Sequence, residues 1–267
     1  MKNTLQNTKE AFDTASLTYD ESESRNEILK WMRSIVHEIY LNNFKEGDEL
    51  LELNAGTGID AMFLSGHGIK VHATDISENM INAIKEKIKQ YNLENSVDAE
   101  LCSFENIGQI KESGFDGAMS NFGGLNCINN FEKLSDDLSH KIKSRGKFIA
   151  AVMNKFCPWE IFYYLLKLNF KEAFRRFKKG GIYAGLGDEK IWTYYFSPRE
   201  FAKYFRNHFT IKKIYSLGLY TPSPYLFGIY NRFPFFVKLF MKIDNLIKGI
   251  FPFNRFGDHF IIILERK

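Results

Sequence analysis

The chain has 267 residues, enough to bury one sizeable α/β core, so a second independent domain is not required. Its formal net charge of +4 is mild and its basic residues are scattered through aromatic stretches, so nucleic acid is not an expected partner. Cys102, Cys127 and Cys157 lack the C-x-x-C spacing of a zinc site and indicate no disulfide framework, so we expect a cytoplasmic protein without a metal.

The chain begins with a polar segment, residues 1–23, which ends just after Tyr19 and Asp20. Apolar residues at helical spacing then predict a helix over residues 24–43. His37 lies within this helix, and we interpret it as a surface or half-buried histidine, not a catalytic one.

A strand-like run over residues 48–53 breaks into a turn of small residues, Asn54–Gly58, and a helical pattern follows over 59–65. The two glycines of the turn tolerate a positive φ and leave backbone open to a ligand, and the helix that follows aims unpaired N–H groups at it. A second strand-like run, 69–74, ends on Asp75, where a βαβ unit places an acid that accepts hydrogen bonds from ribose hydroxyls. Together the turn and the acid predict a nucleotide-binding site.

At these residues the sequence resembles class I S-adenosylmethionine-dependent methyltransferases. Their glycine-rich signature, acid-x-Gly-x-Gly-x-Gly, stands here as Glu52-Leu53-Asn54-Ala55-Gly56-Thr57-Gly58. Asn54 takes the first glycine position, and asparagine enters the left-handed region cheaply. Residues 75–80 look like the family's second motif and 115–121 like its fourth, so the resemblance covers roughly residues 19–154.

The resemblance implies S-adenosyl-L-methionine as methyl donor, S-adenosyl-L-homocysteine as product, and no metal. It identifies residues 1–23 as a lid, which we expect to become ordered on binding, with Tyr19 near the methionine end of the donor. Phe104 is placed against adenine, and Ser103 stands where relatives often carry an acid. Asn121 and Phe122, at the polar tip of the fourth strand, come at the carboxyl edge of the sheet, where open α/β folds bind ligands, so we expect them to form the floor beneath the methyl group; a plain loop is the alternative. The expected cofactor-binding residues are Tyr19, Glu52, Asn54, Ala55, Gly56, Gly58, Asp75, Ile76, Met80, Ser103, Phe104, Asn121 and Phe122.

A nicotinamide-binding Rossmann oxidoreductase is the competing hypothesis, because residues 56–61 also fit Gly-x-Gly-x-x-Ala. Glu52 lies inside the strand, where the methyltransferase pattern has its acid and the dinucleotide fingerprint requires none. No second βαβαβ half follows residue 155. No arginine or lysine lies between Asn54 and Gly68 to meet a pyrophosphate, which suits a cationic sulfonium. These features favour the methyl donor.

The remaining pattern predicts an α/β, Rossmann-like sheet of seven strands with helices on both faces and an aromatic-rich cap. Five parallel strands and a parallel sixth are expected, with an antiparallel seventh between strands five and six, as the resemblance implies. The expected helices are 79–91 and 131–142, an aromatic, basic stretch over 158–179, and one that opens at Ser197-Pro198. The expected later strands are 97–102, 115–120, 147–153, a hairpin over 182–196 around Gly185–Asp188, 209–220, and 260–264.

Asp258 and His259 come immediately before the expected seventh strand, 260–264. An antiparallel strand begins where its neighbours end, so Asp258 and His259 should lie at the active edge of the sheet. If the acceptor must lose a proton, His259 is the candidate catalytic base because its free pKa lies near neutrality, and Asp258 is placed to orient it. The alternative is a histidine whose ring satisfies a loop carbonyl.

An amphipathic helix is predicted over residues 235–250, with lysines off its apolar stripe. Such a helix either packs on the core and closes a pocket, or also touches a membrane or a lipid-like substrate. Both cases imply a hydrophobic pocket, because the segments that could roof the site are rich in Phe, Tyr and Leu. The stripe consists of Phe236, Leu239, Phe240, Ile243, Leu246, Ile247 and Ile250.

The expected organisation is an N-terminal lid and helix (1–44), a cofactor-binding core (45–154), and cap insertions with the last two core strands (155–267). The function expected is in-line methyl transfer to a small, hydrophobic or amphipathic acceptor, with peripheral membrane contact through 235–250 left open. Besides the oxidoreductase, the alternative is a non-catalytic protein that holds the nucleoside or docks on a membrane.

Overall fold

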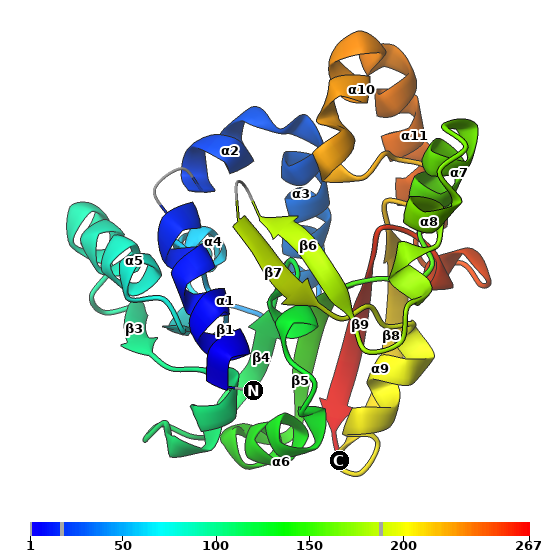
Figure 1. The fold of residues 1–267 in the computed structure, drawn as a ribbon. Helices are drawn as coiled ribbons and strands as arrows, with labels where there is room; N and C mark the ends of the chain where they lie inside the picture. The colour runs from blue at the N-terminus through cyan, green and yellow to red at the C-terminus, as the bar shows by residue number, and fades with distance from the viewer. Residues whose placement is uncertain (1, 17–18, 187–188) are drawn as a thin grey trace.

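A seven-stranded sheet forms the centre of the molecule, in a computed structural model that describes residues 2–16, 19–186 and 189–267 (Figure 1). The strands are β1 (Glu49–Leu53), β2 (Lys70–Asp75), β3 (Val97–Leu101), β4 (Phe115–Ser120), β5 (Ile142–Met153), β8 (Phe209–Leu217) and β9 (His259–Arg266). Their order is β3-β2-β1-β4-β5-β9-β8. Strands β1–β5 pair in parallel, and β9 is antiparallel to both β5 and β8, so β8 runs parallel to β5. The predicted fold class and strand order are confirmed.

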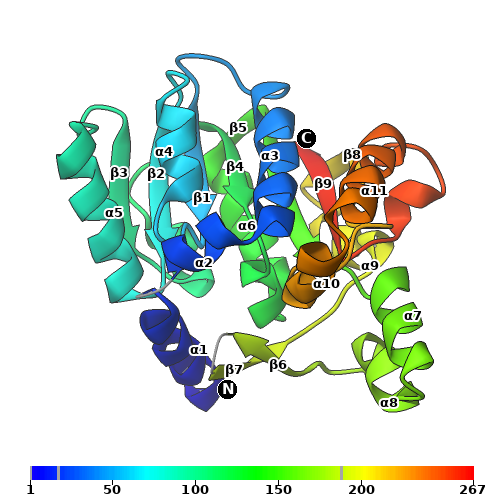
Figure 2. The same cartoon turned by 90° about the horizontal axis from the view of Figure 1, so that it is seen from above.

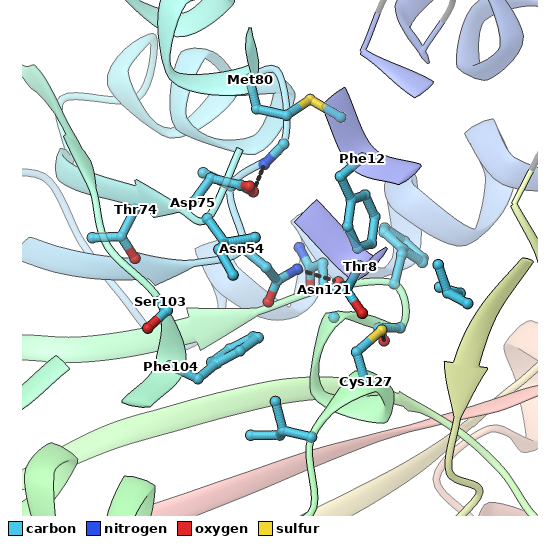
Figure 3. A pocket seen from close by; sticks show the side chains of 18 of the residues that line it. Thr8, Phe12, Asn54, Thr74, Asp75, Met80, Ser103, Phe104, Asn121 and Cys127 are labelled. Carbon is cyan, nitrogen blue, oxygen red and sulfur yellow. Dashed lines mark hydrogen bonds between the residues drawn. The ribbon is translucent and has the colours of Figure 1, made fainter. Parts of the chain in front are cut away.

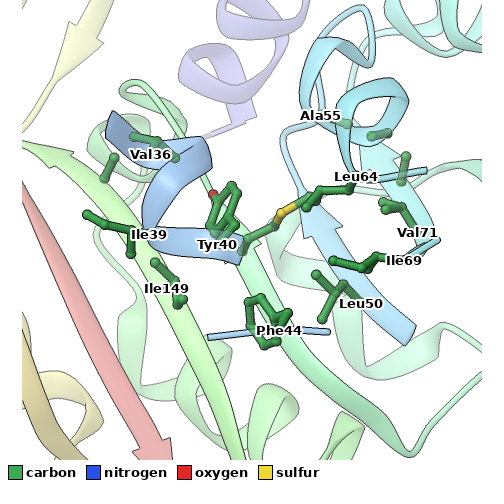
Figure 4. Close-up of a cluster of buried hydrophobic side chains, with 14 of the residues drawn as sticks. Val36, Ile39, Tyr40, Phe44, Leu50, Ala55, Leu64, Ile69, Val71 and Ile149 are labelled. Carbon is green, nitrogen blue, oxygen red and sulfur yellow. The ribbon is translucent and has the colours of Figure 1, made fainter. Parts of the chain in front are cut away.

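Helices cover both faces of this sheet (Figure 2). On one face lie α3 (Glu27–Leu41), α4 (Ile59–Ser65), α5 (Glu78–Tyr91) and α11 (Pro234–Ile247); on the other lie α6 (Phe131–Lys141) and α9 (Pro198–Phe205). Neighbouring residues of β1 alternate between the two cores, since Leu50 packs toward α3 and Leu51 toward α6. Figure 4 shows the first core, where Ile39 and Tyr40 of α3 lie against strands β1 and β5.

Two expected helices have different bounds from those predicted. The helix expected over 24–43 begins at Glu27, because the Asn26 side chain accepts hydrogen bonds from the N–H groups of Ile28 and Leu29 and so caps it. The expected continuous helical stretch over 158–179 is wrong. It is divided into α7 (Pro158–Leu166), α8 (Phe170–Ala173) and the 3₁₀ turn η3 (Arg175–Phe177). Leu168 adopts φ 54°, which no α-helix tolerates, and Asn169 caps the piece that follows.

The hairpin of the cap region packs against the N-terminal segment. Residues 182–196 form the predicted hairpin, with β6 (Ile182–Leu186) antiparallel to β7 (Glu189–Thr193). The N-terminal segment forms α1 (Lys2–Ala15) and α2 (Tyr19–Arg25), and α1 packs against β7. Residues 1, 17 and 18 of the predicted lid, and Gly187 and Asp188 of the predicted turn, lie outside the described residues.

The remaining segments are short: η1 (Phe104–Gln109), η2 (Gly124–Cys127), η4 (Pro224–Leu226), α10 (Phe227–Arg232) and η5 (Phe253–Arg255). Helix α11 packs on the core through Val237 and Met241, whereas Phe236, Leu239 and Leu246 of the predicted apolar stripe are exposed. Phe240, Ile243 and Ile247 of the stripe are half-buried, so the helix packs on the core with only part of the predicted stripe. Among the described residues, no helix is both long and apolar enough to cross a bilayer.

A substitution at Phe131 tests the packing of the second core, which lies between the sheet and helices α6 and α9. Its ring is fully buried and lies 5.2 Å from Phe196, 5.3 Å from Phe201 and 5.1 Å from Tyr204, centroid to centroid. Phe131→Ala should lower the free energy of unfolding, measured by urea denaturation, by about 3–5 kcal/mol because it leaves a cavity. The exposed Leu101 gives the control, since Leu101→Ala should change it by no more than about 0.5 kcal/mol. Equal losses in both variants would contradict this account of the core.

Candidate functional site

A cavity of about 220 Å³ lies at the carboxyl ends of β1, β2, β4 and β5, under α1 and the β6–β7 hairpin (Figure 3). Open α/β sheets bind ligands at this edge. Most of the predicted cofactor-binding residues line the cavity: Tyr19, Asn54, Ala55, Gly56, Asp75, Ile76, Met80, Ser103, Phe104, Asn121 and Phe122. Glu52 and Gly58 do not line it.

The turn after β1 has the left-handed backbone that the sequence predicts. Asn54 has φ 48°, Gly56 has φ 58° and Gly58 has φ 81°. A Cβ on Gly58 would lie 3.0 Å from Ile84 of α5, so this glycine serves the close approach of that helix. Gly56 faces the cavity instead, and only the Tyr19 ring, at 3.8 Å, would meet a Cβ there.

Asp75 holds the turn from the side of β2. Its carboxylate accepts hydrogen bonds from the backbone N–H of Gly56 and of Ser77, each at 2.9 Å. The side chain is buried at the cavity wall, and this burial raises the pKa of Asp75 to about 6, against the opposing effect of these N–H groups. Above that pH a buried carboxylate therefore faces the cavity.

Asn54 holds the same turn from the side of β4. Its Nδ2 donates to the carbonyl oxygen of Asn121 at 2.8 Å, and its Oδ1 accepts from the Ser120 hydroxyl. A Cβ on Gly124 would come within 2.3 Å of the Asn54 side chain, so the loop after β4 can approach only because that residue is glycine. The turn and the β4 tip are thus fixed relative to one another.

Helix α2 is attached to the turn by Asp20. The Asp20 carboxylate accepts a hydrogen bond from the Thr57 hydroxyl at 2.5 Å and pairs with Lys87 of α5 at 2.6 Å. These contacts place the neighbouring Tyr19 ring over Gly56, where it lines the cavity.

The cavity is mainly apolar, with side chains such as Phe12, Phe104 and Met153 in its wall. Its described lining contains two cationic side chains, and both are neutralised. Arg33 pairs with Glu23 and Asp60, and Lys133 pairs with Asp137. The cavity therefore offers a buried carboxylate and apolar walls, which suit a cationic nucleoside better than a pyrophosphate.

Comparison with known proteins agrees with this chemistry. A sequence profile of the methyltransferase domain family matches residues 50–146. An uncharacterized protein of Methanocaldococcus jannaschii is 30% identical over 185 residues, which cover 68% of this chain and 67% of that protein. A demethylmenaquinone methyltransferase of Leptospira interrogans is 28% identical over 169 residues, 60% of this chain and 67% of that protein.

The fold is also that of solved methyltransferases. The structure of geranyl diphosphate C-methyltransferase from Streptomyces coelicolor A3(2), determined with S-adenosyl-L-homocysteine, aligns with a TM-score of 0.56 and 13% identity over 88% of this chain and 79% of that one. The chain belongs to the class I S-adenosylmethionine-dependent methyltransferases. The enzyme uses S-adenosyl-L-methionine as its methyl donor, and the oxidoreductase hypothesis is set aside.

The methyltransferase also contains a buried polar network that sequence reasoning missed. Asp60, in the first turn of α4, accepts hydrogen bonds from Arg33 and Asn121 and lies 2.7 Å from His37 Nε2. Tyr40 donates to the Asn121 side chain at 2.7 Å. Burial would raise the pKa of Asp60, but the Arg33 guanidinium and His37 hold it below its ordinary value. His37 is half-buried, as predicted, yet it belongs to this network.

The sequence contains a signal for this network. Arg33, His37 and Tyr40 recur at i, i+4 and i+7 on a helix whose other buried positions are apolar. A polar row on a buried helix face requires a polar partner, and Asp60 lies in the first turn of the helix that follows the glycine-rich turn. Arg33 and Asp60 both line the cavity.

Glu52 lies beneath the turn and not in the cavity. It is buried in β1, and its Oε2 has no hydrogen-bond partner among the described residues. Burial, followed by the nearby Asp60 charge, raises the pKa of Glu52 well above its ordinary value. Glu52, the acid of the glycine-rich signature, is therefore buried beneath the turn and does not face the cavity.

His259 is the first residue of β9 and lies at the predicted edge. Its Nδ1 is 2.8 Å from Asp258 Oδ2, and its Nε2 is buried with no hydrogen-bond partner among the described residues. The ring packs edge-on against Phe122, with 6.0 Å between centroids. Phe122 lines the cavity, whereas His259 is one layer behind the lining. The orienting contact from Asp258 is present.

Arg176 holds Asp258 in place. Its guanidinium donates to Asp258 Oδ1 and to Glu160 Oε2, each at 2.7 Å. Burial would raise the pKa of Asp258, but the Arg176 guanidinium and the contact with His259 hold it below its ordinary value. The ligand atoms of Asp258, Glu160 and Cys157 lie close together, yet the guanidinium already bridges both carboxylates and burial raises the pKa of the Cys157 thiol to about 12. This cluster does not fit a metal ion.

The Asp75 carboxylate gives a test of the donor site. Asp75→Ala should weaken binding of S-adenosyl-L-methionine, measured by calorimetry, by about tenfold to a hundredfold, since each hydrogen bond to a charged group contributes about 1.5–3 kcal/mol. Wild-type affinity should also fall as the pH drops below about 6, because protonation of Asp75 removes an acceptor. The variant should lack this pH dependence.

Asp98 provides the matched control for that test. It is an exposed acid on β3, paired with His72 at 3.2 Å, so Asp98→Ala should leave donor affinity unchanged. Unaltered affinity in the Asp75 variant would refute its assignment to the donor site.

Proposed function

We propose that this methyltransferase acts on a small, apolar or amphipathic acceptor. The observation that carries this proposal is the part of the cavity beyond the donor residues. There Phe12 of α1, Met153 at the end of β5, and Ile191, Thr193 and Tyr194 of the hairpin segment form the wall. Such an apolar wall with few polar groups selects ligands by burying apolar surface. The relative named for demethylmenaquinone supports a quinone as one such acceptor.

The donor is assigned to the half of the cavity built from β1, β2 and β4. In this proposal Asp75 accepts hydrogen bonds from the ribose, Phe104 and Ser103 face the adenine, and Tyr19 faces the methionine end. Asn121 and Phe122 lie beneath the methyl group. The cavity position of each of these residues supports its role.

When bound, S-adenosyl-L-methionine supplies a methyl group on a sulfonium, which an acceptor nucleophile attacks in line as the carbon–sulfur bond breaks. The protein contributes position, because the turn and the β4 tip are fixed to one another by Asn54. Correct placement in a dry site can lower a barrier by up to about 7–11 kcal/mol. The neutralised Arg33 adds no free positive charge against the sulfonium.

We assign His259 as the base for an acceptor that must lose a proton. Asp258 fixes the Nδ1 side of the ring, so the unpaired Nε2 is the atom that takes the proton. The Phe122 ring lies against His259 and lines the cavity, so it must shift for the acceptor to reach Nε2. Phe122 has φ 46°, an uncommon backbone conformation for a bulky residue, at this point of the site.

His259→Ala should lower kcat by about a hundredfold to ten-thousandfold while leaving donor affinity unchanged, as expected for loss of a general base. The decrease should be largest near neutral pH and smaller at high pH, where the acceptor ionises unaided. Steady-state kinetics across pH measures kcat, and calorimetry measures the affinity for the donor. His140→Ala changes an exposed histidine of α6 and should have no effect. Full activity of the His259 variant would refute the assignment of His259 as the general base.

The acceptor itself is found by incubating the enzyme with methyl-labelled donor and with separate lipid and aqueous extracts of the source cell. Mass spectrometry of a labelled product in the lipid extract supports the proposal. A product confined to the aqueous extract refutes the apolar acceptor. We further place the enzyme in the cytoplasm, in peripheral contact with a membrane through residues 235–250.

A further inference from the structure

Large apolar side chains are exposed mainly on one part of the molecule. Among the described residues, the six most exposed large apolar side chains are 63% to 80% accessible to solvent. All six belong to two segments, 158–179 and 225–257. They are Leu166, Leu168, Phe170, Phe235, Leu246 and Phe251. We call the exposed apolar side chains of these two segments the cap surface. Contiguous exposed apolar surface in a soluble protein marks a site of interaction.

The two segments are joined in space although they are distant in sequence. The ring of Trp159, in α7, packs edge-on against Phe240 of α11 at 6.2 Å. Tyr225 donates a hydrogen bond to Glu160 of α7 at 2.9 Å. Figures 1 and 2 both place α7, α10 and α11 at the end of the sheet formed by β8 and β9. The cap surface therefore belongs to one end of the molecule.

Helix α11 presents its apolar face outward. At 100° per residue, the exposed Phe236, Leu239 and Leu246 lie roughly 150° around the helix from the buried Val237, Met241 and Asp244. This orientation is fixed by a polar contact. The buried Asp244 carboxylate accepts hydrogen bonds from the backbone N–H groups at positions 220 and 221, each at 2.9 Å. The helix thus buries a carboxylate and exposes Phe236, Leu239 and Leu246 of its apolar stripe.

Positive charge accompanies the cap surface. The two segments contain eleven Lys and Arg and three Asp and Glu, a formal charge of +8, whereas the whole chain carries +4. The rest of the chain is therefore at −4. Some of these cations form ion pairs within the protein, as Arg176 does with Glu160. Lys238 and Lys242 on α11, in contrast, are exposed. Exposed apolar residues flanked by lysines fit an anionic surface.

We propose that the cap surface docks on an anionic lipid bilayer, with Phe235, Leu246 and Phe251 entering the interface and the lysines meeting lipid headgroups. Charge favours this partner over a second copy of the chain, because two copies would bring together two surfaces of the same sign. The proposal extends beyond residues 235–250 to α7 and α8. It concerns binding alone and does not depend on the identity of the acceptor.

Vesicle flotation of the full chain, without donor, tests this proposal. The chain should float with vesicles of phosphatidylcholine and phosphatidylglycerol, more weakly with phosphatidylcholine alone, and less as salt is raised. Lys238→Gln with Lys242→Gln should lower partitioning about twenty-five-fold, since each lysine contributes about fivefold near an anionic surface. Phe235→Ser and Leu246→Ser should each lower it about tenfold or more.

A matched control lies at the opposite end of the sheet. Lys89→Gln with Tyr91→Ser removes an exposed lysine and an exposed aromatic ring from α5, and it should leave partitioning unchanged. The proposal is overturned if the wild-type chain stays with the unbound fraction, or if the control loses as much binding as the cap variants. It is also overturned if sedimentation shows a dimer that the cap variants dissociate.

Discussion

Hydrogen bonds from both neighbouring strands hold the turn after β1 in a left-handed path. Asp75 accepts from the Gly56 N–H on one side, and Asn54 donates to Asn121 on the other. Neither contact is local in sequence, so the turn adopts its shape only when β1, β2 and β4 are paired in register. The shape of the turn that we assign to the donor is therefore a property of the assembled sheet.

The buried network around Asp60 extends this constraint to the helices. Arg33 and His37 of α3 and Asn121 of β4 all contact the Asp60 carboxylate, which lies in the first turn of α4. Loss of one partner of a buried charge typically costs about 3–5 kcal/mol, because the remaining charge is left unpaired. Asn121 takes part in both systems, through its carbonyl oxygen and its side chain. One connected set of hydrogen bonds thus links the cavity floor, the turn and two helices.

The donor half of the site was predictable from the sequence because its signals are short and local. A strand, a glycine turn and an acid at the end of the next strand fix where Gly56 and Asp75 lie, and the allowed φ of asparagine accounted for Asn54. The partner of Arg33 was not predictable in the same way, because Asp60 is 27 residues away and only the packing of α3 on α4 brings them together.

The orientation of α11 shows a different limit. Periodicity gives the angular position of an apolar stripe, but it does not say whether that stripe faces the core or the solvent. The buried Asp244, which binds the chain after β8, decides the matter. Likewise, the aromatic stretch after Pro158 has helical composition throughout, yet the left-handed Leu168 divides it.

The two halves of the enzyme have separate structural origins. In the assignment that we propose, the donor side is built from residues 19–122, whereas the acceptor wall and the cap surface come largely from segments inserted around β5, β8 and β9. His259 joins them, since it begins β9, is oriented by Asp258 under Arg176 of the cap, and packs on Phe122 of the donor side. A change of acceptor can therefore arise by altering the inserted segments while the turn, Asp75 and the Asp60 network stay as they are.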